Sequence, residues 1–148
     1  MKAYIVALTV IAIVTIFSQV RCHEEDKAWK KFFGQCSEQY KISQDVVKSI
    51  VYYDFVLPDY EVACWIRCVM NKLRMIKEGK IDWENIKNLS KQGLPTVGDK
   101  MKVDKIAEIC QAEVPHEEID ECRLAYFAAV CQINNWKELG IPKGNVKL

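Results

Sequence analysis

Apolar residues recur at three- and four-residue steps from residue 24 onward, which is the spacing of amphipathic helices. No segment alternates convincingly enough to predict a β-hairpin. Capping residues and turn signals divide the pattern into helices expected at 24–40, 43–53, 59–77, 82–89, 99–111 and 115–135. The predicted fold class is therefore all-α, a compact bundle of about six helices.

Several residues are expected to fix where these helices begin and end. Glu78-Gly79-Lys80 is expected to stop the third helix, and the strip from Trp136 onward, with its glycines and Pro142, is expected not to be helical. The expected helix starts are marked by Ser43, Asp59, Asp82 and Pro115.

The N-terminal segment has the composition of a secretory signal peptide. Lys2 precedes an apolar run over residues 3–17 that only two threonine hydroxyls interrupt. A transmembrane anchor, the alternative, needs about 20 apolar residues, and this run is shorter. We therefore expect residues 1–22 to be removed before His23, with cleavage after Val20 as the other option. Residues 23–148 would then be one secreted, extracellular helical domain.

The chain carries seven cysteines, and removal of residues 1–22 takes Cys22 and leaves an even six. Six cysteines in a small secreted chain imply a disulfide framework. Cys64 and Cys68 lie on one side of the predicted third helix, so they more readily bond to other elements than to each other. Cys122 and Cys131 face opposite sides of the last helix. Spacing alone leaves many pairings open.

The spacing C-x27-C-x3-C-x41-C-x11-C-x8-C resembles the signature of insect odorant-binding proteins, the family that includes pheromone-binding proteins. Its x3 and x8 intervals match the most constant spacings of that family. The resemblance implies three interlocked disulfides, Cys36–Cys68, Cys64–Cys122 and Cys110–Cys131. It also implies an apolar cavity enclosed by the helices.

The same resemblance implies a function. The chain would bind small hydrophobic molecules (odorants, pheromones or fatty-acid-like ligands) and transport them through aqueous fluid, without a cofactor. The alternative within the fold is a scavenger or lipid carrier in a non-sensory fluid such as saliva or haemolymph. A membrane chemoreceptor reached indirectly and a weak homodimer are further expected partners. The near-neutral formal charge of +1 argues against nucleic acid as a partner.

Bulky apolar residues on the predicted helices are the candidates for lining the ligand pocket. Tyr126 and Trp136 each combine an apolar body with a hydrogen-bond donor and could orient a ligand. For every candidate the alternative is ordinary core packing. The candidate ligand-binding residues are Phe55, Trp65, Val69, Leu73, Met101, Ile106, Tyr126, Phe127, Val130 and Trp136.

Catalytic and metal-binding functions find little support in the sequence. There is no G-x-S-x-G motif, and only His23 and His116 could act as imidazole bases, so no catalytic residue is assigned and no enzyme is predicted. The x3 cysteine pair has no nearby histidine, which argues against a zinc module. A protein-interaction role without a ligand remains the other alternative.

Three smaller features complete the sequence. Trp136–Leu148 is expected to form a wall or lid of the pocket, with an exposed end as the alternative. Asn88-Leu89-Ser90 is an N-glycosylation sequon. His23 and His116 supply little for a histidine-driven, pH-dependent release of ligand.

Overall fold

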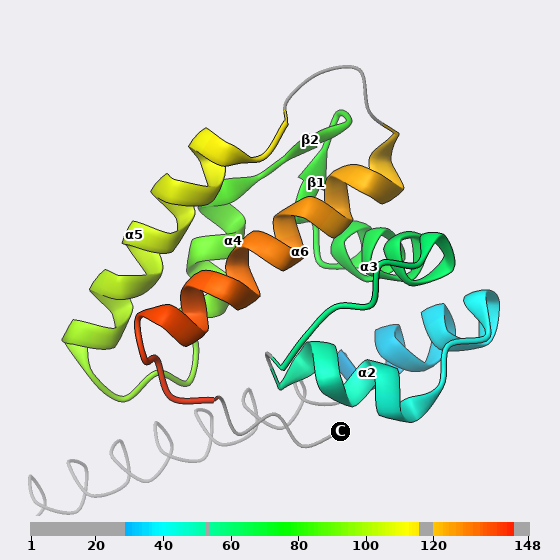
Figure 1. Cartoon of the computed structure of the whole chain (residues 1–148), viewed down its shortest axis with the longest axis horizontal. Coiled ribbons are helices and arrows are strands. Elements are labelled where there is room, and N and C mark those ends of the chain that lie inside the picture. Colours follow the sequence, from blue (N-terminus) through cyan, green and yellow to red (C-terminus); the bar gives the residue numbers. More distant parts are fainter. Residues whose placement is uncertain (1–28, 53, 116–119, 144–148) are drawn as a thin grey trace, which may run out of the picture.

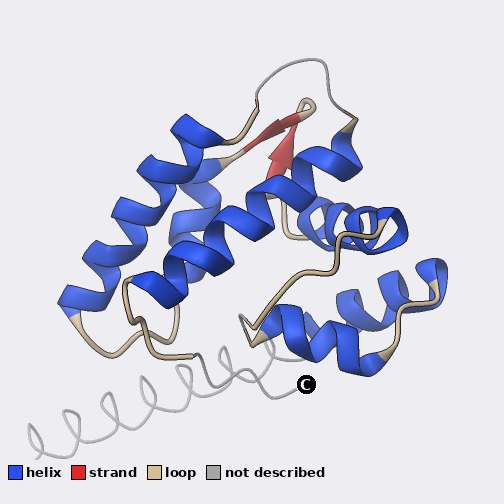
Figure 2. Ribbon diagram, viewed as in Figure 1, coloured by secondary structure: helices blue, strands red, loops and turns tan. Residues whose placement is uncertain are grey.

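The computed structural model describes residues 29–52, 54–115 and 120–143. Over these residues the chain forms a helical segment at 29–40, followed by α2 (Gln44–Val51), α3 (Tyr60–Lys72), α4 (Trp83–Ser90), α5 (Val97–Glu113) and α6 (Glu121–Glu138). Turns, connections and a two-stranded sheet make up the remainder of this part of the chain (Figure 2). The predicted all-α class is confirmed.

Helix α6 lies across the middle of the molecule (Figure 1). Helices α4 and α5 lie on one side of it, and α3, α2 and the 29–40 segment lie on the other. All six helices contribute side chains to one hydrophobic core. The core positions of α6 include Ala125 and Ala128, both fully buried, and such small side chains allow a neighbouring helix to approach closely.

Three disulfides fasten the helices to one another. Cys36–Cys68 joins the 29–40 segment to α3, Cys64–Cys122 joins α3 to α6, and Cys110–Cys131 joins α5 to α6. This pairing is the one that the family resemblance implies. Cys64 and Cys68 bond to different elements, and α6 is held from two sides, as the helical spacing of the cysteines indicates.

The expected caps of three helices are confirmed. The side chains of Ser43, Asp59 and Asp82 each accept a hydrogen bond from a backbone N–H in the first turn of α2, α3 and α4. These bonds satisfy donors that a helix leaves unpaired at its start.

The expected end of the third helix was wrong, because α3 stops at Lys72. Arg74 has a left-handed backbone conformation (φ 56°), and the N–H of Met75 returns to the carbonyl of Met70 at 2.8 Å. This closes the helix before Glu78 is reached.

The segment that follows is a short hairpin, which the sequence did not predict. Strand β1 (Ile76–Lys77) pairs antiparallel with β2 (Lys80–Ile81). Glu78 and Gly79 both have positive φ angles, of 53° and 73°. Two such residues form the tight turn whose twist suits a two-residue hairpin loop.

The start of the last helix was also placed wrongly, at Pro115. Asp120 is the actual N-cap of α6, and its carboxylate accepts bonds from the N–H groups of Cys122 and Arg123 at 3.0 and 3.1 Å. Pro115 instead follows Val114, the extended residue that ends α5. The helix also continues past Trp136 to Glu138, so the expectation of a non-helical strip fails there.

The fifth helix starts earlier than expected, and several expectations concern residues outside the described part of the chain. Helix α5 begins at Val97, two residues before the expected Asp99, because Thr96 is its N-cap. Residues 1–22, both histidines and residues 144–148 lie outside the described part of the chain. Within that part, no helix combines the length and apolar character needed to cross a membrane.

Candidate functional site

Four of the ten candidate pocket residues lie deep in the core. Trp65 and Val69 project from α3, Ile106 from α5 and Trp136 from α6, and all four are buried in the same hydrophobic cluster. These four positions therefore line the interior between α3, α5 and α6 with apolar surface.

Trp65 combines its apolar packing with a buried polar contact. Its indole Nε1 donates a hydrogen bond to Ser37 Oγ at 3.1 Å, and its ring stacks on Phe33 with 6.0 Å between centroids. Ser37 is itself buried, although sequence reasoning did not single it out. Its position one residue after Cys36 was the only signal available.

Three further candidates are half-buried at the edge of the core. Leu73 caps the end of α3, while Tyr126 and Val130 lie on α6. Tyr126 packs against the cluster around the Cys64–Cys122 disulfide and contacts the ring of Phe127 edge-on, at 5.7 Å. Its position beside the disulfide indicates that part of its ring shields the disulfide from solvent.

The last three candidates point to solvent. Phe55, Met101 and Phe127 expose 53%, 66% and 41% of their surface, respectively. Met101 lies in the first half of α5, Phe55 in the α2–α3 connection and Phe127 on α6. The structure thus does not bring the ten candidates together into one site.

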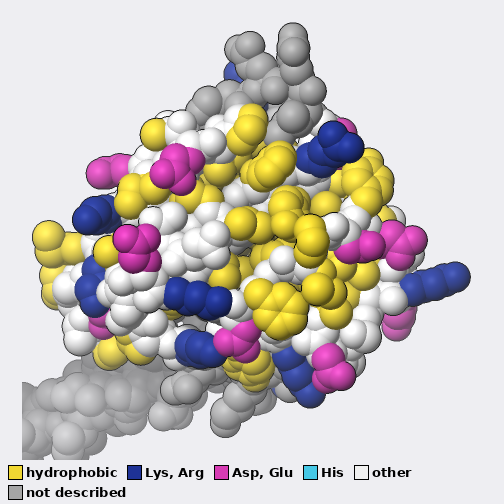
Figure 3. All heavy atoms as spheres, in the orientation of Figure 1, with side chains coloured by type: hydrophobic (Ala, Val, Ile, Leu, Met, Phe, Trp, Pro, Cys, Tyr) yellow, Lys and Arg dark blue, Asp and Glu magenta, His cyan; other side chains and the backbone are white. Residues whose placement is uncertain are grey.

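Exposed apolar side chains gather instead along α6 and the α2–α3 connection (residues 54–59). Figure 3 shows hydrophobic side chains over the middle of the face on which these two elements lie. The exposed large hydrophobic residues of this region are Phe55, Leu57, Tyr60 and Phe127.

The α2–α3 connection is held at both ends. At its start, the ammonium groups of Lys137 and Lys143 contact the backbone carbonyl and the carboxylate of Asp54. Just after its end, the hydroxyl of Tyr60 donates to Asp120 Oδ1 at 3.5 Å. The connection therefore runs alongside α6 and covers part of the core with Val56.

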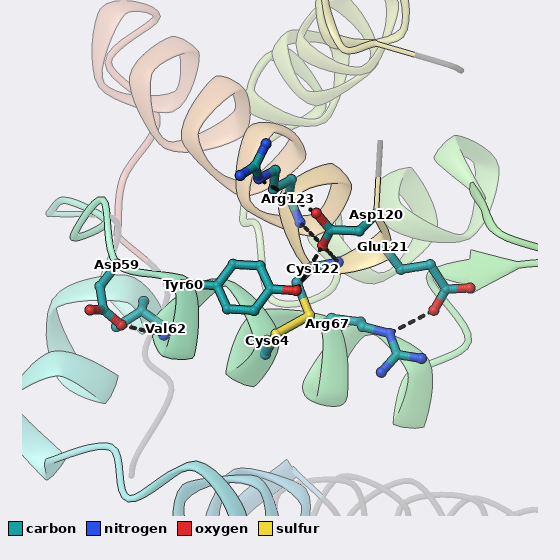
Figure 4. The surroundings of a disulfide bond; sticks show 9 residues. All are labelled: Asp59, Tyr60, Val62, Cys64, Arg67, Asp120, Glu121, Cys122 and Arg123. Carbon is teal, nitrogen blue, oxygen red and sulfur yellow. Dashed lines mark hydrogen bonds and ion pairs between the residues drawn. A yellow bond between two sulfur atoms is a disulfide. The ribbon is translucent and has the colours of Figure 1, made fainter. Parts of the chain in front are cut away.

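A polar rim surrounds the Cys64–Cys122 disulfide at the start of α6 (Figure 4). The guanidinium of Arg67 reaches from α3 to Glu121, with Nε and Oε2 2.6 Å apart. This hydrogen bond raises the pKa of Arg67 above its ordinary value, so the group stays charged. Together with the Tyr60–Asp120 hydrogen bond, this ion pair links α3 to the start of α6.

The end of α6 packs onto the body of the protein. Trp136 and Ile141 are buried, and the N–H of Ile141 donates to the carbonyl of Trp136 at 3.2 Å. Leu139 packs against the same core. The described part of the expected lid is thus a piece of the core wall, and residues 144–148 lie outside the described part.

A surface pocket of about 410 Å³ lies between the hairpin, α4 and α5. Its lining mixes lysines with carboxylates, and the hydrogen bond that Lys87 donates to the Glu84 carboxylate raises the pKa of Lys87. None of the ten candidate residues borders it. The lining residues are Lys77, Lys80, Ile81, Asp82, Trp83, Glu84, Lys87, Ala107, Glu108 and Gln111.

Sequence reasoning missed other residues of the interior. Met70 of α3 and Leu124 of α6 are buried in the core cluster beside the four interior candidates. Met70 follows Val69 directly, and its flexible side chain was the signal that could have drawn attention to it.

Among the described residues, no three His, Cys, Asp or Glu side chains are grouped so that they could hold a metal ion.

A protein-family model matches most of the chain. The model described as the PBP/GOBP family matches residues 22–135, a range that contains all six disulfide-bonded cysteines. Comparison with curated proteins gives no match.

Three solved structures that are similar to this one come from insects. An odorant-binding protein of Drosophila melanogaster is 21% identical, with a TM-score of 0.64, over 80% of this chain and 97% of its own. Pheromone-binding protein 3 of Epiphyas postvittana is 26% identical, with a TM-score of 0.59, over 75% and 97%. A fatty-acid-binding protein from the oral disk of the blowfly Phormia regina is 22% identical, with a TM-score of 0.55, over 78% and 94%.

Proposed function

Because the chain belongs to the PBP/GOBP family, we propose that it is a secreted carrier of small hydrophobic molecules. Residues 1–22 act as the signal peptide, and residues 23–148 form the mature protein in an extracellular fluid. The carrier takes up an odorant, a pheromone or a fatty-acid-like ligand and moves it through water.

The family match is the observation that carries this proposal, and the three disulfides support it physically. Each staple restricts the unfolded chain and so stabilises a small domain by about 2–4 kcal/mol. A domain stabilised in this way tolerates incomplete packing of its interior. Space lined by apolar atoms stays dry and accepts apolar ligands.

We place the ligand between α3, α5 and α6, in contact with Trp65, Val69, Ile106 and Trp136. These side chains are apolar and shielded from water, which a hydrophobic ligand requires. Leu73 packs against this core, whereas Tyr126 packs against the separate cluster around the Cys64–Cys122 disulfide and Val130 is half-buried on α6. Tyr126 is the candidate donor to a polar group of the ligand. Phe55, Met101 and Phe127 contribute less because they face solvent.

A displacement assay tests the proposal. The mature protein is titrated with N-phenyl-1-naphthylamine, which fluoresces in apolar surroundings, and the bound probe is then displaced by long-chain alcohols, terpenoids and fatty acids. Saturable binding of the probe in the micromolar range, with displacement, is expected. No saturable binding would instead support the protein-interaction role.

A second candidate is a lipid carrier in a non-sensory fluid. It is favoured by the similarity to the blowfly structure, which is a fatty-acid-binding protein of the oral disk. The two candidates differ in ligand and tissue. Native mass spectrometry of protein purified from its source would identify the ligand, and the transcript would identify the tissue. A co-purifying fatty acid and a transcript in salivary tissue would support the lipid carrier, whereas a volatile and a transcript in sensory tissue would support the odorant carrier.

We further propose that the chain acts by binding alone, without catalysis or a cofactor, as expected for a binding-protein family. Incubation with ester and phospholipid substrates should then give no turnover. Indirect delivery to a membrane chemoreceptor and weak homodimerisation stay predictions of the resemblance.

A further inference from the structure

Helix α4 ends in a sequon whose acceptor side chain points to solvent. Asn88, Leu89 and Ser90 are the last three residues of the helix. The core contacts of α4 come from Trp83 and Ile86, which are buried, whereas Asn88 is exposed. Asn88 lies roughly 200° round the helix from Ile86, on the opposite face. A bulky group on Asn88 would therefore extend into water without displacing core residues.

The amide of Asn88 has no structural task among the described residues. The neighbouring Asn85 is different, because its Nδ2 donates to the carbonyls of Leu73 and Arg74 at 2.8 and 2.9 Å. These bonds tie the start of the hairpin to α4, and Asn85 is not part of a sequon. Among the described residues, no group hydrogen-bonds to the side chain of Asn88.

We propose that Asn88 carries an N-linked glycan in the secreted protein. This rests on the secretion that forms part of the proposed function. In the reaction, an oligosaccharide is transferred from a lipid-linked pyrophosphate donor to Nδ2 of Asn88. The sugar C1–O bond to pyrophosphate breaks, the C1–N bond forms, and the amide nitrogen gives up one proton. Ser90 supplies the hydroxyl that the sequon requires.

The acceptor segment is modified while the chain is still being translocated, before α4 forms. The folded structure then only has to accommodate the product, and the exposure of Asn88 meets that requirement. The glycan would project from the outer side of α4, on the same face as Glu84, which lies one turn earlier and lines the pocket beside the hairpin.

Secretion from insect cells tests the proposal. Full-length protein and a version with an unrelated signal peptide before His23 are collected from the medium. Their intact masses are measured by mass spectrometry. We expect a mass above that of the polypeptide, removed by a peptide N-glycosidase that converts Asn88 to Asp. Both Asn88→Gln and Ser90→Ala should abolish the added mass, and Ser90→Thr should keep it.

Asn71→Gln is the matched control, because Asn71 is exposed near the end of α3 and lies outside any sequon. It should leave the added mass unchanged. Secreted protein with an unmodified Asn88 would overturn the glycan proposal. Failure of the natural residues 1–22 alone to direct secretion would overturn the proposed signal peptide, while the version with the unrelated signal still decides on Asn88.

Discussion

The indole of Trp65 and the hydroxyl of Ser37 form a buried hydrogen bond between α3 and the 29–40 segment, with Nε1 and Oγ 3.1 Å apart. Trp65 is 1% exposed and Ser37 8% exposed, so water cannot replace either partner. The bond crosses the same pair of elements as the Cys36–Cys68 disulfide. A polar contact and a covalent staple thus hold the first helical segment in place together.

Ser37→Ala should destabilise the protein by about 1–3 kcal/mol, because it leaves the buried indole N–H without its acceptor. Trp65→Phe should cost a similar amount, because it leaves the buried hydroxyl of Ser37 without its donor. The double variant should cost less than the sum of the two, since neither partner is then left alone. Urea unfolding of all four proteins measures this coupling, and strict additivity would contradict a direct bond.

The three disulfides should contribute unequally. They span 32, 58 and 21 residues of sequence. The chain-entropy relation gives about 3.7, 4.2 and 3.3 kcal/mol for Cys36–Cys68, Cys64–Cys122 and Cys110–Cys131. Replacing each pair by alanines should lower the unfolding free energy most for Cys64–Cys122. Thermal denaturation ranks the variants, and peptide mapping that joined Cys64 to Cys68 would refute the pairing.

Asp54→Ala should loosen the α2–α3 connection while leaving the fold intact. It removes the ion pair with Lys143, and an exposed pair of this kind contributes about 0–1 kcal/mol. Hydrogen exchange should accelerate at residues 54–59 and stay unchanged in α5. Glu138→Ala, an exposed carboxylate on α6, is the control. Unaltered exchange of the connection would show that the Asp54 carboxylate does not hold it in place.

Thr96→Ala should weaken the start of α5 and change its pH dependence. The hydroxyl of Thr96 donates to Asp99 Oδ2 at 2.7 Å and accepts from the Asp99 N–H at 3.0 Å. Loss of this cap should cost about 1 kcal/mol at neutral pH. Thr96→Ser, which keeps the hydroxyl, is the matched control.

The same hydroxyl lowers the pKa of Asp99, helped by Lys102. The carboxylate therefore stabilises the fold above the unfolded-state value of about 3.9, and this stabilisation is lost as pH falls through the folded-state pKa. In Thr96→Ala the pKa of Asp99 should rise toward its ordinary value. An NMR titration of the Asp99 carboxyl carbon checks the direction, and an unchanged midpoint would contradict it.

Two variants on α5 separate interior binding from surface binding. Ile106→Ala should lower stability by about 2–5 kcal/mol, because it leaves a cavity, and should alter the affinity for an apolar probe. Met101→Ala, on the exposed side of the same helix, should leave both unchanged. Probe titrations of the two folded variants decide between the sites. A loss of affinity only in Met101→Ala would place the ligand on the surface.

The sequence determined the helical framework because its signals are local. Ser43, Asp59 and Asp82 cap helices with their own side chains, and the apolar period marks which faces are buried. The cysteine spacing pointed to a family whose pairing the structure reproduces. The sequence also marked Asn88 as a sequon, although only the structure showed that its side chain is exposed.

The misplaced helix boundaries have local physical causes that helix propensity does not reveal. Arg74 ends α3 by adopting a left-handed conformation that ordinary residues seldom take, and Glu78-Gly79 can then turn a hairpin instead of a helix end. Asp120 starts α6 because its carboxylate accepts two backbone bonds, which Pro115 has no side-chain group to do.

Only the tertiary structure decided which apolar residues share the interior. Trp65, Ile106 and Trp136 come from three helices, and their meeting depends on how α6 packs across the molecule. On a helix, the period of the sequence marks apolar positions but cannot tell a buried Ile106 from an exposed Met101. Burial depends on the neighbouring helix, and disulfides far apart in the chain fix where that neighbour lies.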